Sequence, residues 1–147
     1  MRLYTQMPEL VGATTWLNSK PLTMQMLLGK PTIIHFWSVS CTLCKTVMPT
    51  LNHFRQQYDE LINVIAVHMP RGNEDLDIQK ISAQAEQHAI TQPIFIDNEL
   101  LLSDAFQNRF VPAYYVFDSN GKLRHYQAGE GGIKLLEKRV NRIIRES

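Results

Sequence analysis

The chain contains two cysteines, Cys41 and Cys44, with two residues between them. This CxxC spacing is used by redox dithiols, in which one thiolate attacks a disulfide and the second thiol resolves the product. Zinc sites use the same spacing, and two buried thiols that only pack are a third interpretation. The surrounding residues must decide between redox chemistry, metal binding and packing.

A zinc site would need further ligands, which the histidines of the chain could supply (His35, His53, His68, His88 and His125). A closed zinc site usually has a second close pair of ligands, such as CxxC or HxxxH. No histidine here lies three to five residues from another, so the spacing disfavours zinc. The sequence predicts no metal and no other cofactor.

The residues on either side of the cysteines predict a strand followed by a helix. Residues 31–39, PTIIHFWSV, are apolar, β-branched and aromatic, which is typical of a buried strand. After the cysteines, Val47, Leu51 and Phe54 follow one another at helical spacing. Cys41 then lies where a helix begins, and the unpaired backbone N–H groups there favour a thiolate. Cys44 falls on the same helical face, which suits a nucleophile and a resolving thiol.

The rest of the chain predicts further strands and helices around this unit. Strands are expected over 62–69 and 93–97, with a helix between them that Asp77 caps and that runs to His88. A short helix around 100–106 precedes a hairpin over 112–129, whose turn at Asn120 and Gly121 tolerates positive φ, and an amphipathic helix over 133–145 ends the chain. This order predicts an α/β fold with a mixed sheet and helices on both faces.

Length and charge narrow the classes of function. A chain of 147 residues without repeats or linkers predicts one domain over 1–147. Fifteen basic and 14 acidic residues leave a net charge of +1, which gives no reason to expect binding to nucleic acid or to a membrane. The N-terminus has no secretory-signal pattern, so we expect a cytoplasmic protein, in which a CxxC pair is more often catalytic or metal-binding than structural.

Two segments carry a family resemblance. FWSVSCTLCKTVMP, with Pro49 eight residues beyond Cys41, resembles the active-site segment of thioredoxin-like thiol–disulfide oxidoreductases. FVPAYYVFD, with Val111 before Pro112, resembles their cis-proline loop. Together with an N-terminal extension and an extra helix and strand over 77–97, the resemblance covers nearly the whole chain. The subgroup that the chain resembles is that of the redoxins.

This resemblance implies roles for the residues around the cysteines. It makes Cys41 the nucleophile and Cys44 the resolving thiol, with Pro112 in the cis form and the backbone of Val111 offering hydrogen bonds to an extended peptide. Trp37 either lines this substrate site or is a core aromatic residue. The implied activity is thiol–disulfide exchange on a protein or small-molecule disulfide, with an upstream thiol reductant that the sequence does not identify. The expected cytoplasmic setting favours the reducing direction, and we expect a monomer.

Three residues depart from the family pattern. His35 stands where thioredoxins carry a buried aspartate that handles the proton of the resolving thiol, so it is either a proton acceptor or a packing residue. Ser40 replaces a tryptophan, which predicts a more exposed Cys41. Val47 replaces a glutamate of the cytochrome-maturation reductases of this subgroup, so their specialised chemistry is not expected here.

Two other functions compete with disulfide reduction. A peroxiredoxin-like peroxidase would carry Pro-x-x-x-Thr/Ser-x-x-Cys; Ser38 fits this pattern, whereas Ile34 replaces the proline. A binding module could use the cis-proline groove with incidental thiols, although an intact CxxC weakens that interpretation.

Overall fold

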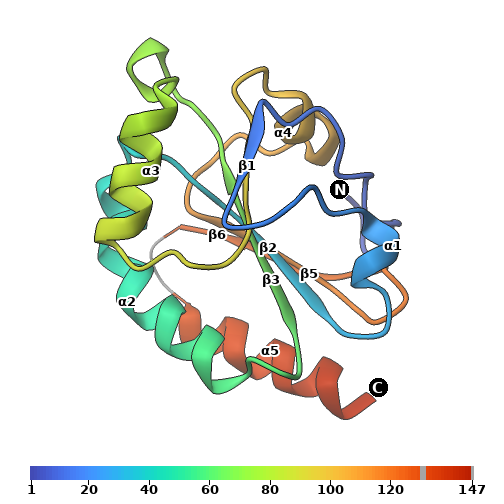
Figure 1. Ribbon diagram of the computed structural model, residues 1–147. Coiled ribbons are helices and arrows are strands. Elements are labelled where there is room, and N and C mark those ends of the chain that lie inside the picture. The colour runs from blue at the N-terminus through green and yellow to red at the C-terminus, as the bar shows by residue number, and fades with distance from the viewer. Residues whose placement is uncertain (130–131, 147) are drawn as a thin grey trace.

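The computed structural model describes residues 1–129 and 132–146, which form a mixed sheet with helices on both of its faces (Figure 1). The strands are β1 Thr15–Leu17, β2 Thr32–Trp37, β3 Asn63–His68, β4 Ile94–Ile96, β5 Ala113–Phe117 and β6 Leu123–Ala128. Their order in the sheet is β1-β4-β3-β2-β5-β6. Strands β2, β3 and β4 run parallel, whereas β1, β5 and β6 pair antiparallel with their neighbours. The predicted mixed α/β architecture is confirmed.

The helices divide between the two faces of this sheet. They are α1 Met24–Leu27, α2 Thr42–Gln57, α3 Ile78–Gln87, α4 Leu101–Phe106 and α5 Ile133–Glu146, with a 3-10 turn at Asn73–Asp75. One apolar cluster joins α2, α3 and α5 to the sheet, and a second joins α1, α4 and the N-terminal extension to the opposite face. The extension runs beside the start of β6, where the amide of Met7 donates to the carbonyl of Gly121 at 2.8 Å. In the described part of the chain, no helix combines the length and apolarity needed to span a membrane.

The central position of β2 explains its composition. All six of its residues are buried, because β3 and β5 flank it and helices cover both faces. Ile33 and Trp37 point into the cluster of α2, whereas Ile34 and Phe36 point into the opposite one. His35 is two residues from both Ile33 and Trp37, so its side chain points to the same face of the sheet, which α2 covers.

Helix α2 begins directly at the cysteine pair. Cys41 is its N-cap residue, and the buried side of the helix carries Val47, Leu51 and Phe54 as the spacing predicts. Pro49 lies inside the helix on its exposed side, where the carbonyl of Lys45 can bind water instead of the missing N–H. The strand therefore delivers both cysteines to a helix N-terminus.

Asp77 caps α3 as predicted. Its carboxylate accepts hydrogen bonds from the backbone amides of Gln79 and Lys80, at 3.0 and 3.4 Å. We expect Asp77→Ala to lower the free energy of unfolding by about 1 kcal/mol, because these amides lose their partner. Urea unfolding measures this loss. Glu86→Ala, at an exposed position in the same helix, is the control, and an equal loss in both variants would contradict the capping role.

The turn between β5 and β6 differs from the prediction. Gly121 has φ 77°, whereas Asn120 is not in the positive-φ region. The carboxylate of Asp118 accepts from the amides of Asn120 and Lys122, each at 3.0 Å, and its carbonyl accepts from Gly121 at 2.9 Å. The side chain of Asp118 thus closes a longer turn, in which only the glycine needs the left-handed conformation.

Candidate active site

The two cysteines form a disulfide at the N-terminus of α2. Their Cα atoms are 5.3 Å apart, and the Cys41 sulfur accepts a hydrogen bond from the Cys44 amide at 3.1 Å. Cys41 retains 3 % of its surface exposed, whereas Cys44 retains 0 %. The same amide and the positive end of the helix dipole would stabilise a thiolate on Cys41 after reduction. In the described part of the chain, no group of three His, Cys, Asp or Glu residues is arranged to hold a metal.

Cys41 is largely buried, although a serine stands at the position of the family's tryptophan. Although Ser40 is exposed and has no large side chain, Cys41 belongs to the apolar cluster that also contains Trp37, Val39 and Met48. The sulfur is covered from beneath by this cluster, so a flap at position 40 is not needed to bury it.

Hydrogen bonds from the end of β3 hold the segment that leads into Cys41. The Val39 amide donates to Nε2 of His68 at 3.1 Å, and the Ser38 hydroxyl donates to the carbonyl of Met69. Burial lowers the pKa of His68 to about 4, although the nearby Asp75 carboxylate opposes this shift. His68 is therefore neutral near neutral pH, and its free Nε2 lone pair can accept the Val39 N–H.

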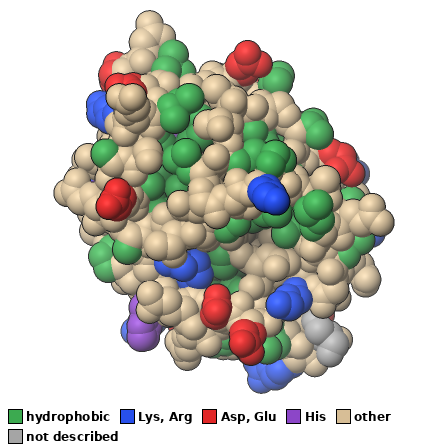
Figure 2. Space-filling view, in the orientation of Figure 1, with side chains coloured by type: hydrophobic (Ala, Val, Ile, Leu, Met, Phe, Trp, Pro, Cys, Tyr) green, Lys and Arg blue, Asp and Glu red, His purple; other side chains and the backbone are tan. Residues whose placement is uncertain are grey.

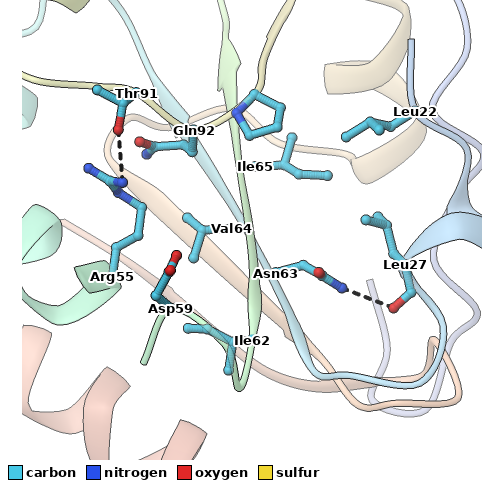
Figure 3. Close-up of a pocket in the computed structure, with 11 residues that line it drawn as sticks. Leu22, Leu27, Arg55, Asp59, Ile62, Asn63, Val64, Ile65, Thr91 and Gln92 are labelled. Carbon is cyan, nitrogen blue, oxygen red and sulfur yellow. Dashed lines mark hydrogen bonds between the residues drawn. The ribbon is translucent and has the colours of Figure 1, made fainter. Parts of the chain in front are cut away.

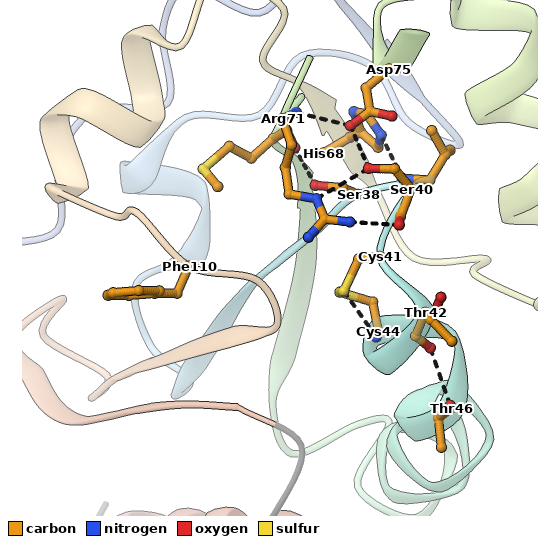
Figure 4. Close-up of a disulfide and its surroundings, with 12 residues drawn as sticks. Ser38, Ser40, Cys41, Thr42, Cys44, Thr46, His68, Arg71, Asp75 and Phe110 are labelled. Atoms are coloured by element: carbon orange, nitrogen blue, oxygen red, sulfur yellow. Dashed lines mark hydrogen bonds between the residues drawn. A yellow bond between two sulfur atoms is a disulfide. The ribbon is translucent and has the colours of Figure 1, made fainter.

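A polar cluster of Ser40, Arg71 and Asp75 lies next to the disulfide (Figure 4). The buried Asp75 carboxylate accepts from the Ser40 hydroxyl at 2.7 Å and from the Arg71 amide at 2.9 Å. The Arg71 guanidinium donates from Nε to the Ser40 hydroxyl at 3.1 Å and from Nη2 to the Ser40 carbonyl. This carbonyl belongs to the peptide bond between Ser40 and Cys41, so the cluster fixes the backbone one bond before the nucleophile.

His35 is buried in the middle of the sheet. Its Nε2 lies 2.8 Å from the side-chain amide nitrogen of Gln92, which can only donate, and its ring stacks on Tyr114 with a centroid distance of 6.4 Å. Burial, together with the smaller effect of the positive charge of Arg55, lowers the pKa of His35 to about 3. The ring is therefore neutral near neutral pH, with its acceptor nitrogen already bound to Gln92.

Beyond Gln92 lies a pocket of about 360 Å³ whose walls carry Arg55, Asp59 and Thr91 (Figure 3). It opens beside Asn63 and Val64, at the start of β3, whereas the cysteines follow the end of β2. Because β2 and β3 are parallel, the pocket and the disulfide lie at opposite ends of the sheet. The pocket is not part of the redox site.

The loop before β5 has the features that the resemblance implies. The Val111–Pro112 bond is cis, and Val111 packs against the apolar cluster that contains both cysteines. The Pro112 carbonyl accepts from Gly129 at 2.9 Å, whereas Val111 makes no backbone hydrogen bond within the described residues. The preceding Phe110 is 64 % exposed. Trp37, in contrast, is buried and meets the His68 ring edge to face.

The sequence analysis considers His68 only as a possible zinc ligand and does not predict that His68, Arg71 or Asp75 lies beside the cysteines. The segment RGNEDLD reads as a polar loop, and His68 as one residue of a buried strand. The available signal was topological: parallel strands end at the same edge of a sheet, so residues after β3 must lie beside those after β2. Polar residues at the end of the second parallel strand are therefore candidates for the same site.

A mixed sheet whose central strand delivers a CxxC disulfide to a helix N-terminus, opposite a cis-proline loop, defines a thiol–disulfide oxidoreductase. Comparison with known proteins supports this class. The chain belongs to the AhpC/TSA family, whose sequence model matches residues 5–126.

Its relatives include the thiol-disulfide oxidoreductase YkuV of Bacillus subtilis (strain 168), which is 56% identical over 147 residues and covers 100% of this chain and 99% of its own. Protein DipZ of Mycobacterium tuberculosis (strain CDC 1551 / Oshkosh) is 33% identical over 144 residues, with coverage of 95% of this chain and 21% of DipZ. A solved structure, a thioredoxin-like protein in the oxidized form, has 56% identity, a TM-score of 0.91, and coverage of 100% of this chain and 99% of its own. The predicted thioredoxin-like fold and redoxin family are confirmed.

Proposed function

We propose that this oxidoreductase works as a reductant of protein or small-molecule disulfides, with Cys41 as the nucleophile and Cys44 as the resolving thiol. The observation that carries the assignment is the difference in position and exposure between the two cysteines. Cys41 caps α2 and has the exposed surface of the pair, whereas Cys44 is completely covered. A substrate disulfide can therefore meet Cys41 first.

The proposed reaction is two successive exchanges. The Cys41 thiolate attacks one substrate sulfur and forms a mixed disulfide, while the other substrate sulfur leaves as a thiolate and takes a proton from solvent. The Cys44 thiol loses its proton and attacks the Cys41 sulfur, which releases the second substrate thiol. Two electrons have then passed to the substrate, and a thiol reductant must restore the Cys41–Cys44 dithiol.

Substrate binding is proposed for the cis-proline loop. The free N–H and C=O of Val111 can pair with an extended peptide next to Pro112, as a strand adds to a sheet edge. Trp37 is better assigned to the floor beneath the cysteines, because its buried ring offers almost no surface to a ligand.

For His35 we propose a structural role in place of proton transfer. A proton acceptor for Cys44 needs a free lone pair and a pKa near the working pH. His35 has its Nε2 bound to Gln92 and a pKa of about 3. Its ring instead gives the buried amide nitrogen of Gln92 a hydrogen-bond partner.

The peroxidase alternative receives less support. A peroxidatic cysteine needs a hydroxyl directed at its sulfur, but the Ser38 hydroxyl donates to the carbonyl of Met69. Ile34, at the position of the missing proline, points to the opposite face of the sheet. The single domain, the monomeric state and the cytoplasmic location stay predictions from the sequence.

The proposed order of attack is tested by trapping the intermediate. Reduced Cys44→Ser protein, mixed with an excess of a peptide disulfide, is expected to accumulate a mixed disulfide on Cys41, because no second thiol can release it. Intact mass spectrometry detects the adduct, and dithiothreitol removes it. Wild-type protein under the same conditions is the control and should end as the internal disulfide. An adduct on Cys44 of a Cys41→Ser protein, with none on Cys41 of Cys44→Ser, would reverse the assignment.

A further inference from the structure

Arg71 is held in a fixed position beside the nucleophile. Its Nε and Nη2 groups both donate to Ser40, whose hydroxyl is bound in turn by the buried Asp75 carboxylate. The amide of Arg71 donates to the same carboxylate oxygen. An exposed arginine usually samples many rotamers. These hydrogen bonds hold the guanidinium of Arg71 against Ser40, the residue that precedes Cys41.

The charge of this guanidinium has no carboxylate partner in the described part of the chain. There, the side-chain ion pairs within 4.0 Å are those of Arg124 with Asp118 and with Glu146. Asp75 binds the backbone amide of Arg71 and the Ser40 hydroxyl, not the guanidinium. No described residue accepts a hydrogen bond from Nη1 of Arg71. A cation with a free pair of N–H donors therefore faces solvent beside the disulfide.

The groups on the other sides of the disulfide are mainly apolar. Leu43 in the first turn of α2 and Phe110 before the cis-proline loop are both exposed. Figure 4 shows Arg71 and Phe110 on different sides of the cysteines. Two further cations belong to these segments: Lys45, which follows Cys44 and is half-buried, and Arg109, which precedes Phe110 and is exposed. Charge recognition at the reactive sulfur can thus come from Arg71, Lys45 or Arg109, and the guanidinium of Arg71 is the one that hydrogen bonds to Ser40 hold next to Cys41.

We propose that Arg71 binds a carboxylate of the substrate and so selects disulfides that carry a negative charge close to their sulfurs. This proposal rests on the proposed function, since it concerns the disulfide that Cys41 attacks. A guanidinium is suited to this role because its planar donors match a carboxylate. Holding it through Ser40 reduces the rotamer entropy that binding would otherwise cost. The carboxylate can belong to an acidic residue of a protein or to a small disulfide.

The test compares three small disulfides of similar length and different charge: dithiodipropionate, bis(hydroxyethyl) disulfide and cystamine. Pre-reduced protein is mixed with an excess of each, and the second-order rate of thiol loss is measured. A change in the reactivity of Cys41 alone would multiply all three rates by one factor. A carboxylate site changes the ratio of the anionic to the neutral rate, and this ratio is the quantity to compare between variants.

We expect Arg71→Gln to lower this ratio by about five-fold. This is the effect of losing one exposed charge pair whose donor is held in place. Arg71→Glu should turn the preference toward cystamine. Arg145→Gln removes the same charge near the far end of α2 and should leave the ratio unchanged, as the control. Peptide disulfides with Asp or Asn beside the cysteine show whether the carboxylate comes from a protein or from a small disulfide. If the ratio of the Asp to the Asn peptide rate exceeds the ratio of the anionic to the neutral small-disulfide rate, a protein carboxylate is favoured.

Two outcomes would overturn the proposal. If Arg71→Gln reduces the neutral disulfide like wild type and keeps the wild-type ratio, the carboxylate site does not exist while the proposed function stands. If Lys45→Gln or Arg109→Gln lowers the ratio and Arg71→Gln does not, the selectivity belongs to that other cation. Failure of the wild type to reduce any of the three disulfides would instead refute the proposed function, and the Arg71 proposal with it.

Discussion

Cys41→Ser is expected to lower the rate of disulfide reduction by about a thousand-fold or more, because a serine hydroxyl cannot supply the sulfur nucleophile. Cys41 is the cysteine of the pair that retains some exposed surface, and the hydrogen bond from the Cys44 amide would favour its thiolate. Loss of Cys44 has a different consequence. Cys44→Ser should complete the first exchange and then stop, so it shows at most one slow turnover.

The measurement is insulin or model-peptide reduction by pre-reduced protein, with a chemical thiol that regenerates the wild type. Thr42→Ser, in the same exposed turn, is the matched control and should keep wild-type activity. Thermal unfolding of each oxidised or reduced variant checks that it is folded. Full activity of Cys41→Ser would refute the assignment of the nucleophile, and an inactive wild type would refute the direction of the proposed reaction.

Local pattern was enough to predict most elements of this fold. The apolar run over 31–39, the helical spacing after Cys44 and the cap at Asp77 each depend on residues close in sequence. The sequence predicts where the turn at Asn120 and Gly121 lies but not its backbone conformation. The hydrogen bonds of the Asp118 side chain determine that only Gly121 takes a positive φ.

The surroundings of the cysteines could not be predicted in the same way. Asp75 meets Ser40 across 35 residues, and His68 meets Val39 across 29. Such contacts follow from the pairing of β2 with β3 and from the length of the loop after it, which periodicity does not encode. The same limit applies to His35, whose two possible roles depended on a partner, Gln92, that lies 57 residues away.

These two buried histidines predict a strong loss of stability in mild acid. Burial lowers the pKa of His35 to about 3 and that of His68 to about 4, from an ordinary 6.5. As the pH falls below 6.5, the unfolded chain binds these protons and the folded protein does not, so the free energy of unfolding decreases. The loss continues until the pH reaches each folded-state pKa. Between about pH 7 and pH 5, linkage gives about 2 kcal/mol for each histidine.

Urea unfolding at these two pH values measures the loss of stability. Carboxylates with ordinary pKa values stay largely ionised between pH 7 and pH 5, so the loss reports mainly on the histidines. His35→Gln and His68→Gln should each remove about half of the loss seen in the wild type, since glutamine does not titrate there. His53→Gln, at an exposed position on α2, is the control and should keep the wild-type loss.

Equal pH dependence in all variants would show that neither buried ring resists protonation. The same His35→Gln protein also decides between the two roles of His35. If His35→Gln loses less stability in acid than the wild type and reduces disulfides with the wild-type rate and pH profile, the proton of Cys44 leaves without this ring. His35 then has a structural role through its contact with Gln92. A rate that falls together with a changed pH profile would instead make His35 part of the proton transfer.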